Sequence, residues 1–276
     1  MTEPGPPRLP RLSAFLLLRA LCKTARPQGR ALQSVFAADA LDRTHLARYR
    51  AAFGFPGEGI PLTYHYLAVQ RAHLLTMLDD AFPFRIAGMV HISNLLEELM
   101  PMNADQPYQL HTRIEIEAPA ENGARYCECV TEARQHGQTV FRCSSRYLAM
   151  RGTARRRSAA HVAGEPAFVS IGGWQVAADD GWRYAALSGD WNPIHLGRWP
   201  ARLLGLQRPI IHGMHTLAKT CALLEQAEGK TMRFLNCRFR SPVPLGAGVA
   251  ISMQAENGSF RLTCEEQVAV EGSFRN

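Results

Sequence analysis

The sequence lacks several features that would define its class at once. No apolar run approaches the roughly 18 residues that a membrane-spanning helix needs, and the run from Ala14 to Leu18 ends at Arg19. The seven cysteines are odd in number and widely spread, which does not fit a disulfide framework and favours a reducing compartment. No nucleic-acid-binding signature is present. We therefore expect a protein of the cytoplasm, with no integral membrane segment and no nucleic-acid partner.

The composition fits a globular protein with a sizeable core. The 276 residues are 46% hydrophobic and 20% charged, which suits one large domain or two small ones. The formal net charge is +7, a modest basic excess that favours an anionic ligand or an acidic partner.

Two distant parts of the chain repeat each other. Residues 120–123 and 255–258 both read AENG, 135 residues apart, and the same offset aligns Arg48–Phe55 with Arg183–Asp190. One offset that links two separate segments indicates a duplication. A further similarity, between Ile86–Met89 and Ile211–Met214, needs an offset of 125.

The segment 151–166 reads as a linker because it is rich in Arg, Ala, Gly and Ser and has no apolar periodicity. Its arginine cluster, Arg155 to Arg157, is interpreted as a solvated run. The predicted domains are an N-terminal extension (1–44) with a short helix from Leu12 to Cys22, a first repeat (45–150), the linker, and a second repeat (167–276).

Each repeat shows a helical pattern followed by strands. Apolar residues at helical spacing predict a helix after Gly213 and another after Gly88; the second helix rests on Met89, Ile92, Leu95, Leu96 and Leu99. Alternating runs predict the strands: Leu110 to Ile116, Phe141 to Tyr147, Leu235 to Phe239, Val249 to Met253 and Phe260 to Cys264. Asn122-Gly123 and Asn257-Gly258 are hairpin-turn signals. A helix followed by antiparallel strands, twice, predicts an α+β fold.

The stretch Tyr184 to His195, YAALSGDWNPIH, concentrates polar chemistry in a small space. Asn192-Pro193 marks a turn, because the residue before proline is disfavoured in the α region. Asp190 and His195 then flank a tight bend and can face one small volume. A carboxylate and an imidazole that converge can hold a water molecule and move its proton.

This stretch resembles the motif of the MaoC-like, or hydratase 2, family of (R)-specific enoyl-thioester hydratases and dehydratases. Arg208–Met214, RPIIHGM, resembles the family's second motif, and Phe234–Val243 resembles its central strand. The resemblance implies a double hot-dog fold, in which each repeat wraps a sheet around a central helix. It implies that Asp190 and His195 are catalytic, that Asn192 orients them, and that the N–H of Gly213 contacts the thioester oxygen. It implies neither a metal nor an organic cofactor.

The resemblance also sets the expected reaction. It implies the dehydration of (3R)-hydroxyacyl thioesters, or the hydration of trans-2-enoyl thioesters, with the acyl group on coenzyme A or on an acyl carrier protein. Phe55 stands where the second repeat has Asp190, so one active site per chain is expected, with the first repeat as a wall of the acyl tunnel. The alternatives are a hot-dog acyl thioesterase and a non-catalytic acyl-binding module. A homodimer is a further expectation.

Several residues have a second interpretation. His212 and His215, with His195, could offer three nitrogen ligands to a metal, but no His-Glu-x-x-His pattern is present, and capping or lining roles are favoured. Gly213 could simply ease packing at a helix start. Cys221 and the pair Cys127-x-Cys129 are interpreted as packing residues. Arg238 or Arg240 could meet the phosphates of coenzyme A.

Overall fold

The computed structural model describes residues 5–25, 32–153, 167–203 and 205–276. The helices and strands come in two series preceded by α1 (Ala14–Cys22). The first series is β1 (Leu32–Ala38), α2 (Arg43–Phe53), α3 (Leu62–Met77), β2 (Val90–Glu98), β3 (Tyr108–Ile116), β4 (Arg125–Gln135) and β5 (Gln138–Met150). The second is β6 (Val169–Gln175), α4 (Asp180–Ser188), a 3-10 turn (Pro193–His195), α5 (Arg198–Leu203), α6 (Gly213–Glu228), β7 (Phe234–Phe239), β8 (Gly248–Gln254), β9 (Ser259–Cys264) and β10 (Gln267–Arg275).

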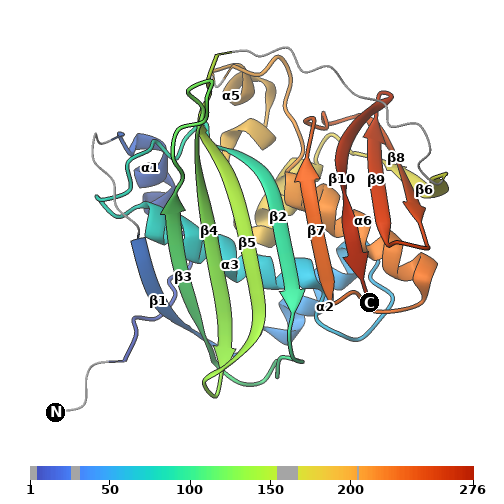
Figure 1. Ribbon diagram of the computed structural model, residues 1–276, viewed down its shortest axis with the longest axis horizontal. Coiled ribbons are helices and arrows are strands. Elements are labelled where there is room, and N and C mark those ends of the chain that lie inside the picture. Colours follow the sequence, from blue (N-terminus) through green and yellow to red (C-terminus); the bar gives the residue numbers. More distant parts are fainter. Residues whose placement is uncertain (1–4, 26–31, 154–166, 204) are drawn as a thin grey trace.

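All ten strands form one antiparallel sheet in the order β1-β3-β4-β5-β2-β7-β10-β9-β8-β6 (Figure 1). Read from each edge to the centre, the two halves use their strands in the same order. They join where β2 pairs with β7, through partners such as Leu95 and Asn236. The predicted α+β class and the paired arrangement of a double hot dog are both confirmed, because each five-stranded half has its own long helix.

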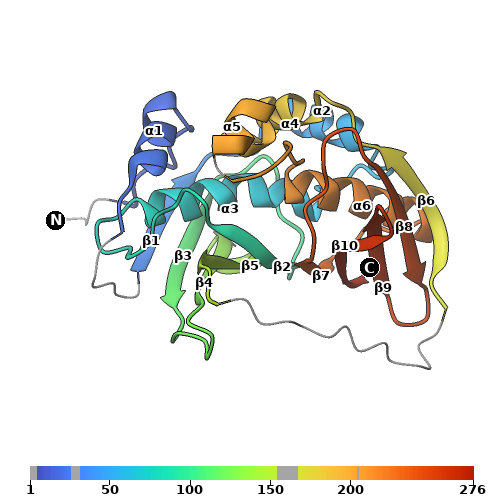
Figure 2. The same ribbon diagram turned by 90° about the horizontal axis from the view of Figure 1, so that it is seen from above.

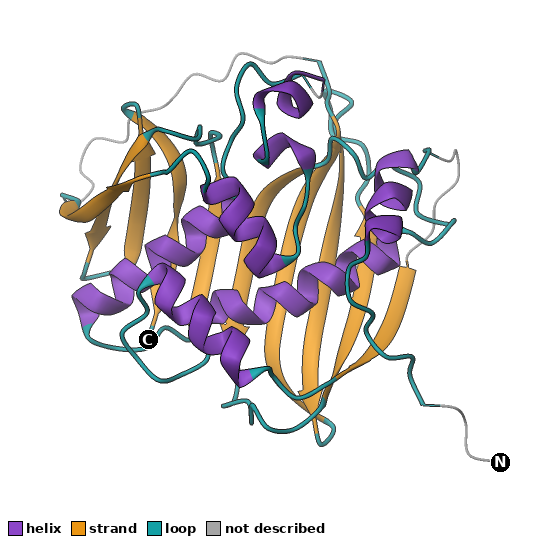
Figure 3. Cartoon of the chain, turned by 180° about the vertical axis from the view of Figure 1, so that it is seen from behind, coloured by secondary structure: helices purple, strands orange, loops and turns teal. Residues whose placement is uncertain are grey.

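The two central helices lie on one face of the sheet, as the view from behind shows (Figure 3). Each has 16 residues, and α2 and α4 lie on the same side (Figure 2). Both central helices are buried over most of their circumference, since the sheet covers one side and shorter helices cover the other. Their side chains join those of both halves of the sheet in one continuous core.

The predicted repeat is visible in the backbone. Gly54 ends α2 and Gly189 ends α4, each in the left-handed conformation with φ of 77° and 80°. Glycine adopts this conformation without the steric cost of a Cβ atom. Gly123 and Gly258 likewise form the hairpins β3–β4 and β8–β9 with positive φ. All four fit the offset of 135 residues.

The predicted helix after Gly88 is wrong. Residues 90–98 form β2, which pairs with β5 on one side and β7 on the other. The apolar residues of this segment fit a helical spacing and a strand spacing, and the pairing on both sides decided between them. The central helix of the first half is α3, so the counterpart of Gly213 is Leu62, at an offset of 151, and the proposed offset of 125 is wrong.

The difference in offset arises from an insertion in the second half. Residues 189–212 connect α4 to α6, whereas only residues 54–61 connect α2 to α3. The long connection contains Asp190, Asn192 and His195. Asp190 aligns with Phe55, whereas most of the longer connection that follows it has no counterpart in the first half.

The predicted boundary at residue 44 falls too late. Residues 32–38 form β1, which pairs with β3 along its length and occupies the edge position that β6 occupies in the other half. Backbone bonds from Ala37 to Pro7 and Leu9 attach the earlier chain to this edge. The short N-terminal helix is confirmed as α1, with the hydroxyl of Ser13 accepting from the N–H of Leu16. Most of the predicted linker, with Arg155 to Arg157, lies outside the described residues.

The cysteines behave as packing residues. All seven are free, so the absence of a disulfide framework is confirmed. Cys127 and Cys129 are buried on one face of β4, as their spacing predicts. Cys221 is buried in α6, where burial raises the pKa of its thiol. Within the described residues, no helix has both the length and the apolar character needed to cross a bilayer.

Candidate active site

The loop after α4 holds Asp190 in a bend. Its N–H donates to the hydroxyl of Ser188 at 3.1 Å, and one of its carboxylate oxygens accepts from the N–H of Asn192 at 3.2 Å. The second contact is an Asx turn, in which an aspartate side chain bonds the backbone two residues on. The local sequence therefore fixes the carboxylate of Asp190.

Asn192 acts mainly through the turn that carries His195. Its side-chain oxygen accepts from the N–H of Ile194 at 3.4 Å and so caps the turn Pro193–His195. Its backbone carbonyl accepts from the N–H of His195 at 3.1 Å, and its own N–H donates to Asp190. Asn192 thus links the two predicted catalytic residues through the backbone rather than by a side-chain contact with Asp190.

His195 is held in one tautomer. Its Nδ1 lies 2.9 Å from the backbone carbonyl of Ile210. A carbonyl only accepts, so Nδ1 carries the proton and Nε2 keeps its lone pair. Gly181 of α4 packs against the same turn, where a Cβ atom at position 181 would lie 1.9 Å from the carbonyl oxygen of His195.

The first half of the chain contributes directly to the site. Gln70 of α3 donates from Nε2 to Asp190 at 2.6 Å, from a position 120 residues earlier. The sequence analysis did not identify Gln70. A glutamine on a buried helix carries no local signal, and only the packing of α3 beside the α4–α6 connection makes it a partner of Asp190.

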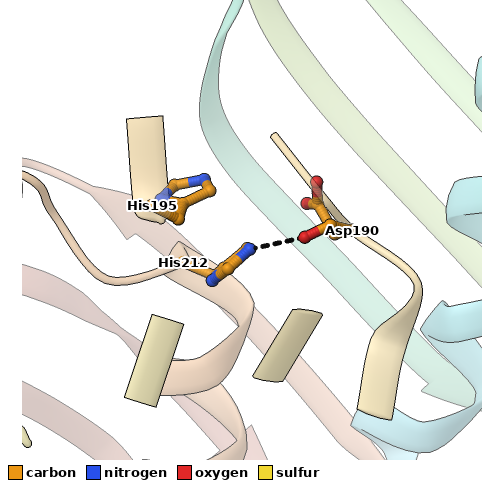
Figure 4. A group of neighbouring side chains, drawn as sticks. All are labelled: Asp190, His195 and His212. Atoms are coloured by element: carbon orange, nitrogen blue, oxygen red, sulfur yellow. Dashed lines mark hydrogen bonds between the residues drawn. The ribbon is translucent and has the colours of Figure 1, made fainter. Parts of the chain in front are cut away.

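His212 completes the group. Its Nε2 donates to the backbone carbonyl of Asp190 at 2.9 Å, and its ring lies 3.7 Å from that of His195, centroid to centroid. Figure 4 shows His195 facing the carboxyl group of Asp190, with His212 beside both. Side-chain atoms of Asp190, His195 and His212 lie within 4.8 Å of one another. The predicted lining role of His212 agrees with this position.

The electrostatics favour a deprotonated pair. Burial by itself opposes ionisation of Asp190, but His212, His195 and the hydrogen bond from Gln70 hold its pKa below the ordinary value. Burial, followed by the nearby His212, lowers the pKa of His195 to about 4, although Asp190 acts in the opposite direction. Near neutral pH the site therefore contains a carboxylate and a neutral imidazole.

The group lines a cavity of about 500 Å³ between the two halves. Apolar side chains of α1, α3 and the segment 86–92 form much of its wall. Met89 and Ile92 lie in this wall, as predicted for the first repeat, although Met89 directly precedes β2 and Ile92 belongs to it, so neither is in a helix. An apolar cavity with a few convergent polar groups is the usual form of a small-molecule site.

Gly213 is the first residue of α6 and also lines the cavity. Its N–H has no hydrogen-bond partner among the described residues, as is usual in the first turn of a helix. The packing interpretation also applies, because a Cβ atom here would lie 2.9 Å from the ring of Phe239. The close packing of Phe239 is thus sufficient reason for a glycine, and the free N–H is a separate property.

The remaining predicted residues, His215, Arg238 and Arg240, differ in where they lie relative to the cavity. His215 lies between Phe53 and Tyr184, and is not part of the Asp190, His195 and His212 group. Arg240 lines the cavity and pairs with Glu271. Arg238 is an exposed residue of β7 and does not line the cavity. Of the two arginines, only Arg240 therefore lines the cavity.

The comparisons with known proteins agree with this fold. Residues 162–273 match the family model described as MaoC like domain. The fold and this match define the class: the chain is a double hot-dog protein whose second half is a MaoC-like domain.

Two curated proteins are similar to this chain in sequence. The chain is 25% identical to 3-hydroxyacyl-thioester dehydratase X of Mycobacterium tuberculosis, over 81% of this chain and 80% of the relative. It is 33% identical to the (R)-specific enoyl-CoA hydratase of Aeromonas caviae, over 33% of this chain and 65% of the relative.

Solved structures show the likeness of fold. The crystal structure of HtdX from Mycobacterium tuberculosis matches with a TM-score of 0.68 and 23% identity, over 88% of this chain and 99% of that one. Another Mycobacterium tuberculosis protein, described as a double hotdog fold, matches with a TM-score of 0.55 and 12% identity, over 90% and 96%. An acyl-ACP thioesterase from Bacteroides thetaiotaomicron matches with a TM-score of 0.56 and 9% identity, over 88% of this chain and 98% of that one. The fold alone therefore does not separate dehydration from thioester hydrolysis.

Proposed function

We propose that this protein catalyses the reversible hydration of trans-2-enoyl thioesters and, in reverse, the dehydration of (3R)-hydroxyacyl thioesters. The observation that carries the proposal is the pair of Asp190 and His195. A carboxylate and a neutral imidazole face one space inside an apolar cavity, with atoms less than 4.8 Å apart. The named relatives, a dehydratase and a hydratase of acyl thioesters, support the same reaction.

The spacing of the pair suits a single water molecule. Two acceptors within 4.8 Å can each take a hydrogen bond of about 2.8 Å from one water between them. In hydration the water oxygen bonds to C3 while one of its protons passes through the pair to C2, so one water supplies both new groups. In dehydration the pair takes the proton from C2 and returns it to the leaving hydroxyl, which departs as water.

Gly213 is proposed to stabilise the charge that develops on the thioester oxygen. Its N–H stands at the start of a 16-residue helix, where the first N–H groups are unpaired and the helix dipole is positive. Fixed donors at a developing oxyanion are among the strongest catalytic contributions. Asn192 is assigned to orientation, because it caps the turn that carries His195.

The first half is proposed to hold no second site. Phe55 follows Gly54 as Asp190 follows Gly189, and it is buried against Tyr49 instead of lining the cavity. A phenyl ring cannot move a proton. Each chain then has one reaction centre, and the first half provides Gln70 and part of the wall.

The proposed chemistry uses neither a metal nor an organic cofactor, because the pair provides the proton transfers itself. The acyl group is carried by coenzyme A or by an acyl carrier protein. Seven free cysteines support a reducing compartment such as the cytoplasm. Fatty-acid or related acyl metabolism is the corresponding setting.

The experiment that tests the function follows the absorbance of the enoyl group of crotonyl-CoA in the presence of the protein. Loss of absorbance without release of free thiol is the expected result. Release of thiol, detected with a thiol reagent, would instead support the alternative thioesterase. Tight binding of enoyl and hydroxyacyl thioesters, on either carrier, without turnover would support the non-catalytic acyl-binding module.

The pH dependence of the reaction follows from the two lowered pKa values. His195 has a pKa of about 4 and that of Asp190 is also lowered, so both groups stay unprotonated as the pH falls from 7 to about 5. We expect kcat/KM for crotonyl-CoA to fall only near pH 4, as the macroscopic titration of the pair. An acid limb near 6.5, the ordinary value for histidine, would contradict this, provided that circular dichroism shows a folded protein throughout.

Gln70→Leu is expected to lower kcat/KM by about ten- to a hundredfold, since a hydrogen bond to a charged group contributes about 1.5–3 kcal/mol. Loss of this donor also raises the pKa of Asp190, so the acid limb should move to higher pH. A residue that only supports packing would change stability and leave the pH profile in place.

The chain offers a matched control for this variant. Gln226 of α6 also donates a 2.6 Å hydrogen bond across the two halves, to the carbonyl of Gly54, and does not line the cavity. Gln226→Leu should therefore leave both kcat/KM and the pH profile unchanged. An unchanged profile in Gln70→Leu would remove Gln70 from the proposed site.

A further inference from the structure

Two helices beside the cavity, α1 and α5, expose large apolar side chains. The surface that carries these side chains is named the mouth of the cavity. On α1, Phe15 is 67% exposed and Leu18 is 57% exposed, and on α5 Trp199 and Leu203 are each 80% exposed. The spacings are i, i+3 on α1 and i, i+4 on α5, so each pair lies on one face of its helix. These four side chains do not line the cavity.

Both helices lie next to residues that line the cavity. The opposite side of α1, with Leu17 and Ala20, lines the cavity, and Leu206 just after α5 does so as well. Leu12, just before α1, lies against Gly189, next to Asp190 in the chain. Figure 2 shows both α1 and α5 on the side of the molecule away from the sheet.

The two chain segments that contain these helices carry basic residues but no acidic ones. Residues 8–24 and 191–213 contain no Asp or Glu, whereas they contain seven basic residues: Arg8, Arg11, Arg19, Lys23, Arg198, Arg202 and Arg208. Arg8 and Arg208 are in ion pairs with acidic residues elsewhere. Within the described part of the chain, Arg11, Arg19, Arg198 and Arg202 have no acidic partner. They lie on or just before the two helices that carry the exposed apolar side chains, so these helices carry positive charge.

We propose that the mouth of the cavity docks on a lipid bilayer that contains anionic headgroups. Exposed Trp, Phe and Leu beside unpaired Arg is the composition of surfaces that lie in a membrane interface. Side chains that are 57–80% exposed protrude from two separate helices, and a fluid acyl layer can close around each of them. The unpaired arginines match lipid phosphates in charge.

Docking in this orientation has a consequence that rests on the proposed function. The mouth faces the bilayer, so an acyl thioester whose chain is dissolved in the lipid can enter the cavity without crossing water. The apolar side of α1 forms the wall that the chain meets first. Long-chain thioesters are thus the substrate class that this surface favours.

The test is co-sedimentation with phosphatidylcholine vesicles, with and without phosphatidylglycerol. The full chain should sediment with the anionic vesicles, and less so with pure phosphatidylcholine or in high salt. The double variants Phe15→Ser/Leu18→Ser and Trp199→Ser/Leu203→Ser should each bind at least about tenfold more weakly, because each loses two large apolar side chains from the interface.

Two further substitutions provide the control. Val169 and Leu99 are 65% and 41% exposed and lie away from the cavity. Val169→Ser/Leu99→Ser should sediment as the unaltered protein does, and every variant should keep its kcat/KM for crotonyl-CoA. Because vesicle binding is measured without turnover, the result of the crotonyl-CoA assay bears on the proposed function and not on the docking.

Three results would overturn the docking proposal. The unaltered protein could remain in the supernatant with anionic vesicles, or the two mouth variants could bind as strongly as the control. In the third case, light scattering would show a dimer that the mouth variants convert to a monomer, without any dependence on vesicles. The surface would then be an interface between two copies of this chain.

Discussion

Asp190→Asn is expected to lower kcat/KM for crotonyl-CoA by at least about 100-fold, because a positioned acid–base group contributes about 10²- to 10⁴-fold. Asparagine has nearly the same shape, and its carbonyl oxygen can still accept from the N–H of Asn192. It cannot take up a proton at neutral pH. The change therefore removes proton transfer from the site and leaves the Asx turn in place.

The control for this prediction is Asp179→Asn. Asp179 precedes α4 and forms an exposed ion pair with Arg183, about ten residues from Asp190 along the chain. Exposed ion pairs of this kind contribute about 0–1 kcal/mol to stability, so neither activity nor melting temperature should change appreciably. Near-full turnover by a folded Asp190→Asn protein would show that Asp190 is not the catalytic carboxylate.

His195→Asn is expected to cause a loss of the same order. The side-chain amide of asparagine can replace Nδ1–H as the donor to the carbonyl of Ile210, but nothing replaces Nε2 at the water position. The variant thus separates the hydrogen bond that holds the turn from the atom that accepts a proton. Thermal unfolding and kcat/KM should be measured together.

His45→Asn is the matched control. His45 bonds the carbonyl of Leu187 at 2.8 Å and is half-buried, yet it does not line the cavity. Its replacement should affect stability at most. The double variant Asp190→Asn/His195→Asn should be about as slow as the slower single variant, because residues that act as a unit are not additive. If the double variant instead lost kcat/KM by the product of the two single losses, a shared proton path would be contradicted.

Much of the site could be predicted from the sequence because its chemistry is local. Asp190, Asn192 and His195 lie within six residues, and the bend that brings them together depends on Gly189, Asn192 and Pro193, which are themselves neighbours. The same holds for the hairpins at Gly123 and Gly258, whose turn residues act through their own backbone.

Other features could not be predicted because they depend on distant pairing. The segment 90–98 has apolar residues that suit either a helix or a strand, and β5 and β7, about 50 and 140 residues further on, make it a strand. Its misassignment also displaced the central helix of the first half. No property of residues 62–77 alone marks them as the partner of α6.

The bend between Asp190 and His195 and the alternation along most strands follow from residues that are close together in the chain, and the repeat follows from the similarity of such local stretches. Three features belong to the folded chain alone: the hydrogen bond from Gln70 to Asp190 across 120 residues, the contact of His212 with His195, and the place of α1 in the cavity wall. These contacts form when the two halves of the sheet join at β2 and β7 and their helices pack together. Burial of entire helix and sheet faces stabilises these contacts, and many different residues can contribute to such a face. No short stretch of the sequence therefore identifies them.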